Sequence, residues 1–121
     1  MDIRAIGHDF SVCKIRDLAG IDLAGEFVFI GKTDEEISLV CLTERAPVDA
    51  LAREDGWKAF RIEGVLDFSL VGILSGLSSV LARNGIGLFV ISTFNTDYIL
   101  TKADQFGRAL ELLSEEGYHI V

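Results

Sequence analysis

The chain of 121 residues has the length of one ordinary domain, and half of its residues are hydrophobic, which suffices for a core without disulfides. Its 11 basic residues are outnumbered by 19 acidic ones, and the net charge of −8 argues against nucleic acid or an anionic membrane as a partner. We see no signal peptide and no apolar stretch long enough to cross a bilayer, so we expect a soluble, cytoplasmic protein.

The first half of the sequence, residues 1–56, is typical of a strand-rich subdomain. We expect three strands, a turn between the last two and one short helix: Phe10–Ile15, Glu26–Ile30, Gly31–Asp34 for the turn, Ile37–Leu42, and Pro47–Arg53 for the helix. Our hypothesis is that this half is a degenerate copy of the module that follows and shares the strand around Trp57 with it.

Cys13 and Cys41 both lie in alternating, strand-like sequence. Buried thiols are the expectation, because a reducing cytosol disfavours a disulfide. Together with His8 and His119 the cysteines show no metal-ligand spacing. We therefore expect no metal site.

The second half, residues 57–121, has the clearer pattern. We expect a strand, a helix, a hairpin of two strands, a second helix and a last strand: Trp57–Ile62, Leu70–Ala82, Ile86–Thr93, Asp97–Thr101, Asp104–Glu116 and Tyr118–Val121. This β-α-β-β-α-β order predicts an α+β fold of the ferredoxin-like class.

The most informative stretch is the polar hairpin Ser92-Thr93-Phe94-Asn95-Thr96-Asp97, which interrupts a strand that is apolar on both faces. Asp97 can pair with an ammonium group, and backbone N–H groups at the start of the preceding helix can hold a carboxylate. Together they suit a zwitterion. Turns also favour Asn, Asp and Thr for their local hydrogen bonds, so a purely structural hairpin stays open.

These residues resemble the ACT domain. The resemblance rests on Gly64-Val65-Leu66-Asp67, on Asn84-Gly85-Ile86-Gly87 and on Ile91 to Leu100, and it is strongest over residues 57–121. Small bacterial aspartokinase-like ACT proteins and the cytosolic arginine sensors of animals are the nearest relatives that it suggests. Aspartokinases carry a kinase domain ahead of their ACT pair that has no counterpart here, so kinase activity is not implied.

ACT domains are regulatory modules that bind amino acids between two copies. By resemblance, the ligand-facing positions are Ser69, Val71, Gly72, Gly85, Ile86, Ser92, Thr93, Thr96 and Asp97. The resemblance implies a sensor without catalytic activity and without a cofactor. The partners that it implies are a free amino acid, a second copy of the chain in a homodimer, and a regulated protein. The alternatives are a ligand-free interaction module and a small ferredoxin-like hydrolase.

Overall fold

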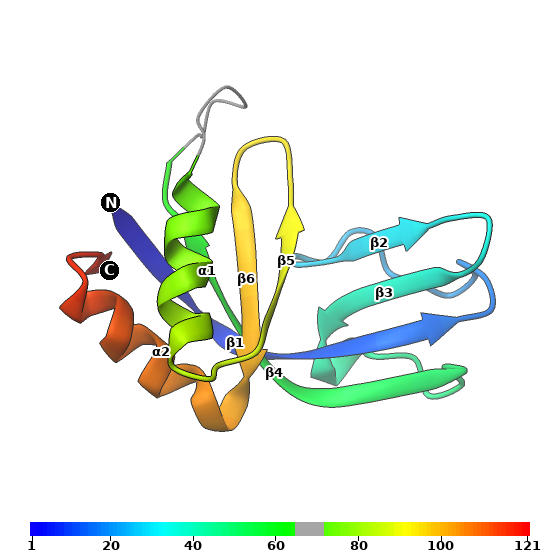
Figure 1. Ribbon diagram of the computed structural model, residues 1–121. Helices are drawn as coiled ribbons and strands as arrows, with labels where there is room; N and C mark the ends of the chain where they lie inside the picture. Colours follow the sequence, from blue (N-terminus) through cyan, green and yellow to red (C-terminus); the bar gives the residue numbers. More distant parts are fainter. Residues whose placement is uncertain (65–71) are drawn as a thin grey trace. The chain divides into compact units, whose positions relative to one another are not determined.

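The structure is a computed structural model that describes residues 1–64 and 72–121 (Figure 1). Its elements, in chain order, are β1 Asp2–Ile15, β2 Phe29–Lys32, β3 Ile37–Leu42, the 3-10 helix η1 Thr43–Arg45, β4 Ala52–Ile62, α1 Ile73–Arg83, β5 Leu88–Ser92, β6 Asp97–Lys102, α2 Ala103–Glu115 and β7 His119–Ile120. Mixed helices and strands in this order confirm the α+β fold class.

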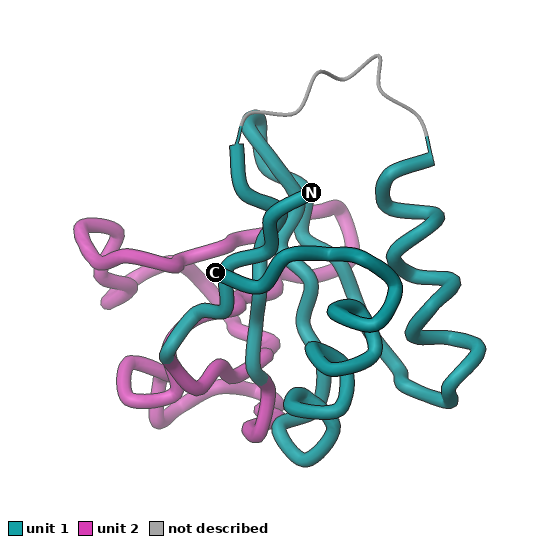
Figure 2. The backbone as a smooth tube through the Cα atoms, turned by 90° about the vertical axis from the view of Figure 1, so that its left-hand side faces the viewer, with its two compact units in different colours: residues 1–7, 58–121 teal, residues 8–57 magenta. Residues whose placement is uncertain are grey.

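The backbone divides into two compact units, coloured separately in Figure 2. We call residues 1–7 and 58–121 the helical unit, and residues 8–57 the strand unit. Strands β1 and β4 each contribute residues to both units, because the boundaries fall inside them. The division into domains at residues 56 and 57 stays a prediction.

The helical unit contains the elements β4, α1, β5, β6, α2 and β7 in the expected β-α-β-β-α-β order. Strands β5 and β6 form the expected antiparallel hairpin, with Leu88 opposite Thr101 and Ser92 opposite Asp97. Both helices pack on one face of the sheet, where Phe60, Ile62 and Ile99 meet Leu77, Leu81, Ala109 and Leu113 in a fully buried core. Apolar residues at helical spacing on both helices thus provide the contacts that hold this unit together.

The start of the chain completes the sheet of the helical unit, which the sequence did not predict. Strand β1 extends back to Asp2, and its first residues lie between β4 and β7. Ile3 pairs in parallel with Ile120 and is wholly buried in the helical core. The sequence pattern of a strand was weak over the first residues, because Ile3 and Ile6 are three positions apart, whereas apolar residues in a half-buried strand recur every second position.

The strand unit is built on β2, β3 and β1, with β3 in the middle. Phe10 lies opposite Leu42 and Ile15 opposite Ile37 in the antiparallel β1–β3 pair. The expected range Ile37–Leu42 is confirmed. Strand β2 starts three residues later than expected and includes Gly31 and Lys32, so the turn falls at residues 33–36, where the Thr33 amide donates to the Glu36 carbonyl at 2.9 Å.

The prediction of a short helix at Pro47–Arg53 is wrong. Residues 47–51 form turns and irregular backbone, and β4 already begins at Ala52. Val48 is fully exposed and Leu51 half exposed, so a helix here has no apolar face to bury. The Leu51 amide instead donates to the Lys14 carbonyl at 2.8 Å.

Both cysteines are buried and free, as expected from their strand-like surroundings. Cys13 lies opposite Leu39 in the β1–β3 register, which makes Cys41 its diagonal neighbour. Burial raises the pKa of the Cys41 thiol to about 11 and also raises the pKa of Cys13. Both side chains are therefore neutral thiols at physiological pH.

Candidate functional site

The polar hairpin is held together by its own side chains. We call Ser92, Thr93, Thr96 and Asp97 the hairpin cluster. The Ser92 hydroxyl donates to Asp97 Oδ1 at 2.6 Å, directly across the last pair of the β5–β6 ladder. The Thr93 amide donates to the Thr96 carbonyl at 2.8 Å, and Thr93 Oγ1 donates to the same oxygen at 3.0 Å. These bonds close the turn around Phe94 and Asn95.

Asp97 and Ser92 lie on the face of the sheet that the helices cover. Side chains alternate along a strand, so Asp97 shares its face with Ile99, and Ser92 shares its face with Val90. Ile99 belongs to the helical core and Val90 packs against it. In Figure 1 the turn between β5 and β6 lies at the same end of the unit as the start of α1. Asp97, the first residue of β6, therefore lies on the helix-covered face, at the end of the unit where α1 begins.

Thr96 fixes the turn to the neighbouring strand. Its hydroxyl donates to the carbonyl of Ile62, the last residue of β4, at 2.7 Å. The side chain is only 8% exposed, so the hydrogen bond replaces one that water cannot supply. Thr96 therefore has a structural role that the sequence did not predict for it.

Gly72 occupies the N-cap position of α1. Its φ of 84° is in the left-handed region, and no side chain caps the helix. A Cβ atom built on Gly72 would meet no atom of the described residues within 4 Å. Helix starts leave unpaired N–H groups with partial positive charge, which attract anions.

Gly85 and Ile86 are not brought to this end of the unit. They follow the last turn of α1, whose 11 residues span roughly 16 Å. The Gly85 amide donates to the Ala82 carbonyl at 3.1 Å, and the Ile86 amide donates to the Leu81 carbonyl at 3.0 Å. With φ of 73° at Gly85 and only 2% exposure of Ile86, both residues terminate the helix and enter the core. Ser69 and Val71 lie outside the described residues.

A charged network that sequence reasoning missed lies beside the hairpin. Arg61 Nη1 donates to the Tyr98 hydroxyl at 3.1 Å, and the guanidinium carbon is 5.9 Å from the centre of the Tyr98 ring. Glu63 accepts hydrogen bonds from both Arg61 and Arg4, and the bond from Arg4 is the main cause that lowers the pKa of Glu63. Arg4 could not be placed here from the sequence, because the strand that carries it was not recognised.

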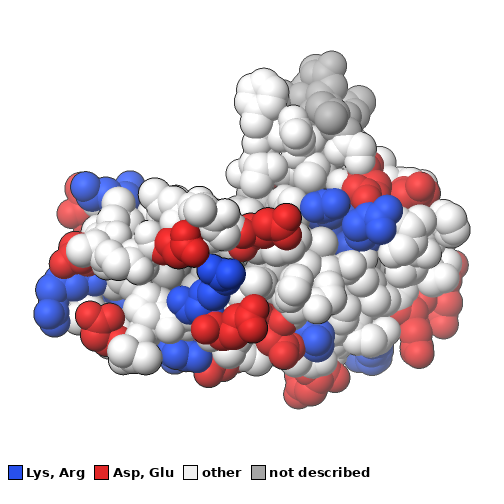
Figure 3. All heavy atoms as spheres, turned by 180° about the vertical axis from the view of Figure 1, so that it is seen from behind, with Lys and Arg blue, Asp and Glu red and all other residues white. Residues whose placement is uncertain are grey.

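Within residues 1–64 and 72–121, no group of His, Cys, Asp and Glu side chains is arranged to hold a metal ion. Across the part of the chain that the structure describes, no helix is both long and apolar enough to span a membrane. On the face shown in Figure 3, basic and acidic groups adjoin one another rather than form a continuous basic surface. That mixture agrees with an overall charge of −8.

The fold is an α+β module, with a polar hairpin at the end of the helical unit where α1 begins. A family model described as ACT domain matches residues 52–115, more than half of the chain. The chain therefore belongs to the ACT domain family, whose members are small-molecule regulatory domains. No curated protein matches the sequence.

Solved structures extend the likeness to the whole chain. Protein Atu0741 of Agrobacterium tumefaciens is 30% identical, with a TM-score of 0.89 over 99% of this chain and 91% of that one. VC0802 of Vibrio cholerae, described as a possible transport protein of unknown function, is 20% identical with a TM-score of 0.74 over 94% and 88% of the two chains. The aspartate kinase of Clostridium acetobutylicum is 12% identical with a TM-score of 0.66, over 93% of this chain but 33% of the kinase. The last two likenesses are of fold.

Proposed function

We propose that this chain is a regulatory protein that binds a free amino acid through the hairpin cluster and the start of α1, and that it catalyses no reaction. The observation that carries the proposal is the position of Asp97. Its side chain is half-buried at the helix-covered face, and Ser92 occupies only its Oδ1 atom. Within the described residues no basic side chain pairs with it, so a cationic ligand group can.

The proposed ligand spans two opposite charges. Its ammonium group pairs with Asp97 and Ser92, and its carboxylate accepts hydrogen bonds from backbone amides at the start of α1, beyond Gly72. Thr93 and Thr96 shape the turn and fix it to β4. Ser69 and Val71 belong to this proposal through the family resemblance alone, while Gly85 and Ile86 lie at the other end of α1, where their amides close the helix.

ACT domains bind amino acids between two modules, so we infer that two copies of the chain form the working unit in the cytoplasm. The ligand then shifts the dimer between two arrangements, and a regulated protein responds to that change. Light scattering after size exclusion, with and without the ligand, tests this assembly. A monomer under both conditions contradicts it.

The function is tested by a thermal-shift screen of the purified chain against the twenty amino acids. A ligand at one hundred times its dissociation constant adds about 2.7 kcal/mol to the free energy of unfolding. Asp97→Asn should abolish that gain, whereas the control Asp49→Asn, at an exposed position with no described partner, should retain it. A flat screen favours the ligand-free interaction module, and turnover of phosphate or ester substrates favours the hydrolase.

A further inference from the structure

A cavity lies wholly inside the strand unit, far along the sequence from the hairpin cluster. Its volume is about 200 Å³. The segment between β1 and β2 supplies Gly20, Ile21, Asp22, Glu26 and Val28, while β3 supplies Leu39 and Cys41 and η1 supplies Arg45. This strand-unit cavity is smaller than the 300–1,000 Å³ or so typical of drug-sized ligands and suits a small metabolite.

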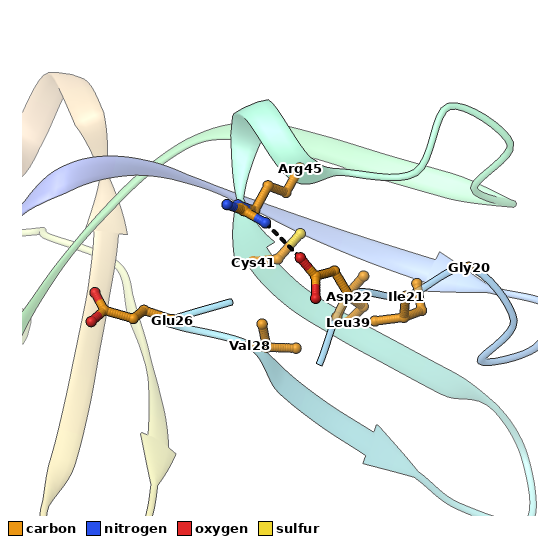
Figure 4. Close-up of a pocket in the computed structure, with 8 residues that line it drawn as sticks. All are labelled: Gly20, Ile21, Asp22, Glu26, Val28, Leu39, Cys41 and Arg45. Carbon is orange, nitrogen blue, oxygen red and sulfur yellow. Dashed lines mark hydrogen bonds and ion pairs between the residues drawn. The ribbon is translucent and has the colours of Figure 1, made fainter. Parts of the chain in front are cut away.

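One side of the cavity is formed by an ion pair. Arg45 Nη1 donates to Asp22 Oδ2 at 2.8 Å (Figure 4). The Ala24 amide donates to Asp22 Oδ1 at 3.0 Å. Gly25 backs the guanidinium so closely that a Cβ atom there would lie 3.3 Å from Nη1. Arg45 makes no other hydrogen bond to the described residues, so Nε and Nη2 remain as donors for a carboxylate.

The other side of the cavity is apolar. Figure 4 shows Val28, Leu39 and Ile21 together on the side away from the guanidinium, with the carboxylate of Glu26 directed away from Arg45. Leu39 and Cys41 belong to the buried core of the strand unit, and Ile21 and Val28 pack against it. The hydrophobic cluster that contains Leu39 and Cys41 has four buried members, and no α-helix lies within residues 8–57 to cover it. An apolar group in the cavity therefore extends the core.

From this geometry we propose that the strand-unit cavity is a second ligand site, which takes a small α-amino acid with an aliphatic side chain. The carboxylate of the ligand pairs with Arg45, its ammonium group pairs with Asp22, and its side chain lies over Ile21, Val28 and Leu39. A zwitterion fits better than a simple carboxylate, because a lone negative charge beside Asp22 is repelled. This proposal does not depend on the hairpin cluster.

Amide NMR of the full-length protein titrated with L-leucine tests the site. We expect shifts at Ile21, Val28, Leu39 and Cys41, and much weaker binding of isocaproate and isoamylamine, which lack the ammonium and the carboxylate respectively. Arg45→Met should weaken L-leucine binding about tenfold or more, through loss of a charge-assisted hydrogen bond.

Three further variants make the outcome decisive. Val28→Phe fills the cavity and should abolish the shifts while leaving the ion pair intact. Arg83→Met, which removes an exposed partner of Glu116 in the helical unit, should leave binding unchanged. Asp97→Asn should also leave it unchanged, which separates this site from the hairpin cluster. Any one of three results overturns the proposal. These are no amide shift among residues 20–45, equal binding of the three probes, and wild-type affinity for L-leucine in both Arg45→Met and Val28→Phe.

Discussion

Replacing Thr96 by valine removes a single hydroxyl from the hairpin cluster and keeps the shape of the side chain. The lost hydrogen bond, 2.7 Å from Oγ1 to the Ile62 carbonyl, leaves that carbonyl without its Thr96 donor at a buried position. An unsatisfied buried group of this kind costs about 1–3 kcal/mol. For a chain of this size, each kcal/mol corresponds to a shift of roughly 3–6 °C in Tm.

The measurement is urea unfolding of Thr96→Val beside two matched variants. Thr96→Ser retains the hydroxyl and should recover most of the lost stability. Thr101→Val changes a second buried threonine, whose hydroxyl makes only a long bond of 3.4 Å to the Lys102 carbonyl, and should cost much less. If Thr96→Val unfolds at the same urea concentration as Thr101→Val, the hydrogen bond to β4 does not hold the hairpin.

Three further outcomes follow from the same structure. Leu77→Ala should lower the free energy of unfolding by about 2–5 kcal/mol in urea titrations, because the side chain is fully buried in the helical core. Burial raises the pKa of the Cys41 thiol to about 11. The contribution of the neutral thiol to the free energy of unfolding is therefore complete below the unfolded pKa of about 8.5 and is lost as the pH rises through the folded value. Cys41→Ala should flatten this alkaline loss of stability. Hydrogen bonds from Arg53 and Ser11 lower the pKa of the Asp55 carboxyl. The contribution of the ionised carboxylate to the free energy of unfolding is therefore complete above about pH 4 and is lost as the pH falls through the folded value. Asp55→Asn should flatten this part of an acid-unfolding curve.

Regions with a strong local pattern could be predicted from the sequence. The two helices carry apolar residues at helical spacing, and Gly85 and Gly117 stop them with φ values of 73° and 100°. The β5–β6 hairpin was recognisable because two apolar runs flank a short polar turn. Local signals of this kind need no knowledge of distant contacts.

The features that sequence reasoning missed depend on long-range contacts. Ile3 is a strand residue because Ile120 pairs with it from the far end of the chain. The ion pair of Asp22 and Arg45 joins residues 23 positions apart. The helix wrongly expected after Pro47 had a plausible local start, but the structure offers no surface on which it could bury an apolar face.

The residues expected to form one ligand site lie at two opposite ends of the helical unit, because α1 separates them. A helix that runs from one end of the unit to the other separates the residue before it, Gly72, from the residue after it, Gly85. Strand β5 then returns to the first end, which brings Ser92 and Asp97 back toward the start of the helix. The β-α-β order therefore places Gly72 and the hairpin at one end of the unit and Gly85 at the other end.

The stability of the fold does not by itself explain why the polar residues Ser92 and Asp97 stand at the end of the β5–β6 pair. Ser92 and Asp97 lie on the same face of the β5–β6 pair as Val90 and Ile99, whose side chains pack in the helical core. The carboxylate of Asp97 adds no apolar area to that core, and its one described hydrogen bond comes from Ser92. An aliphatic pair would extend the core at the same position. A cationic ligand group is the kind of partner that gives the carboxylate a positive contribution, which is why Asp97 is the central residue of the proposed function.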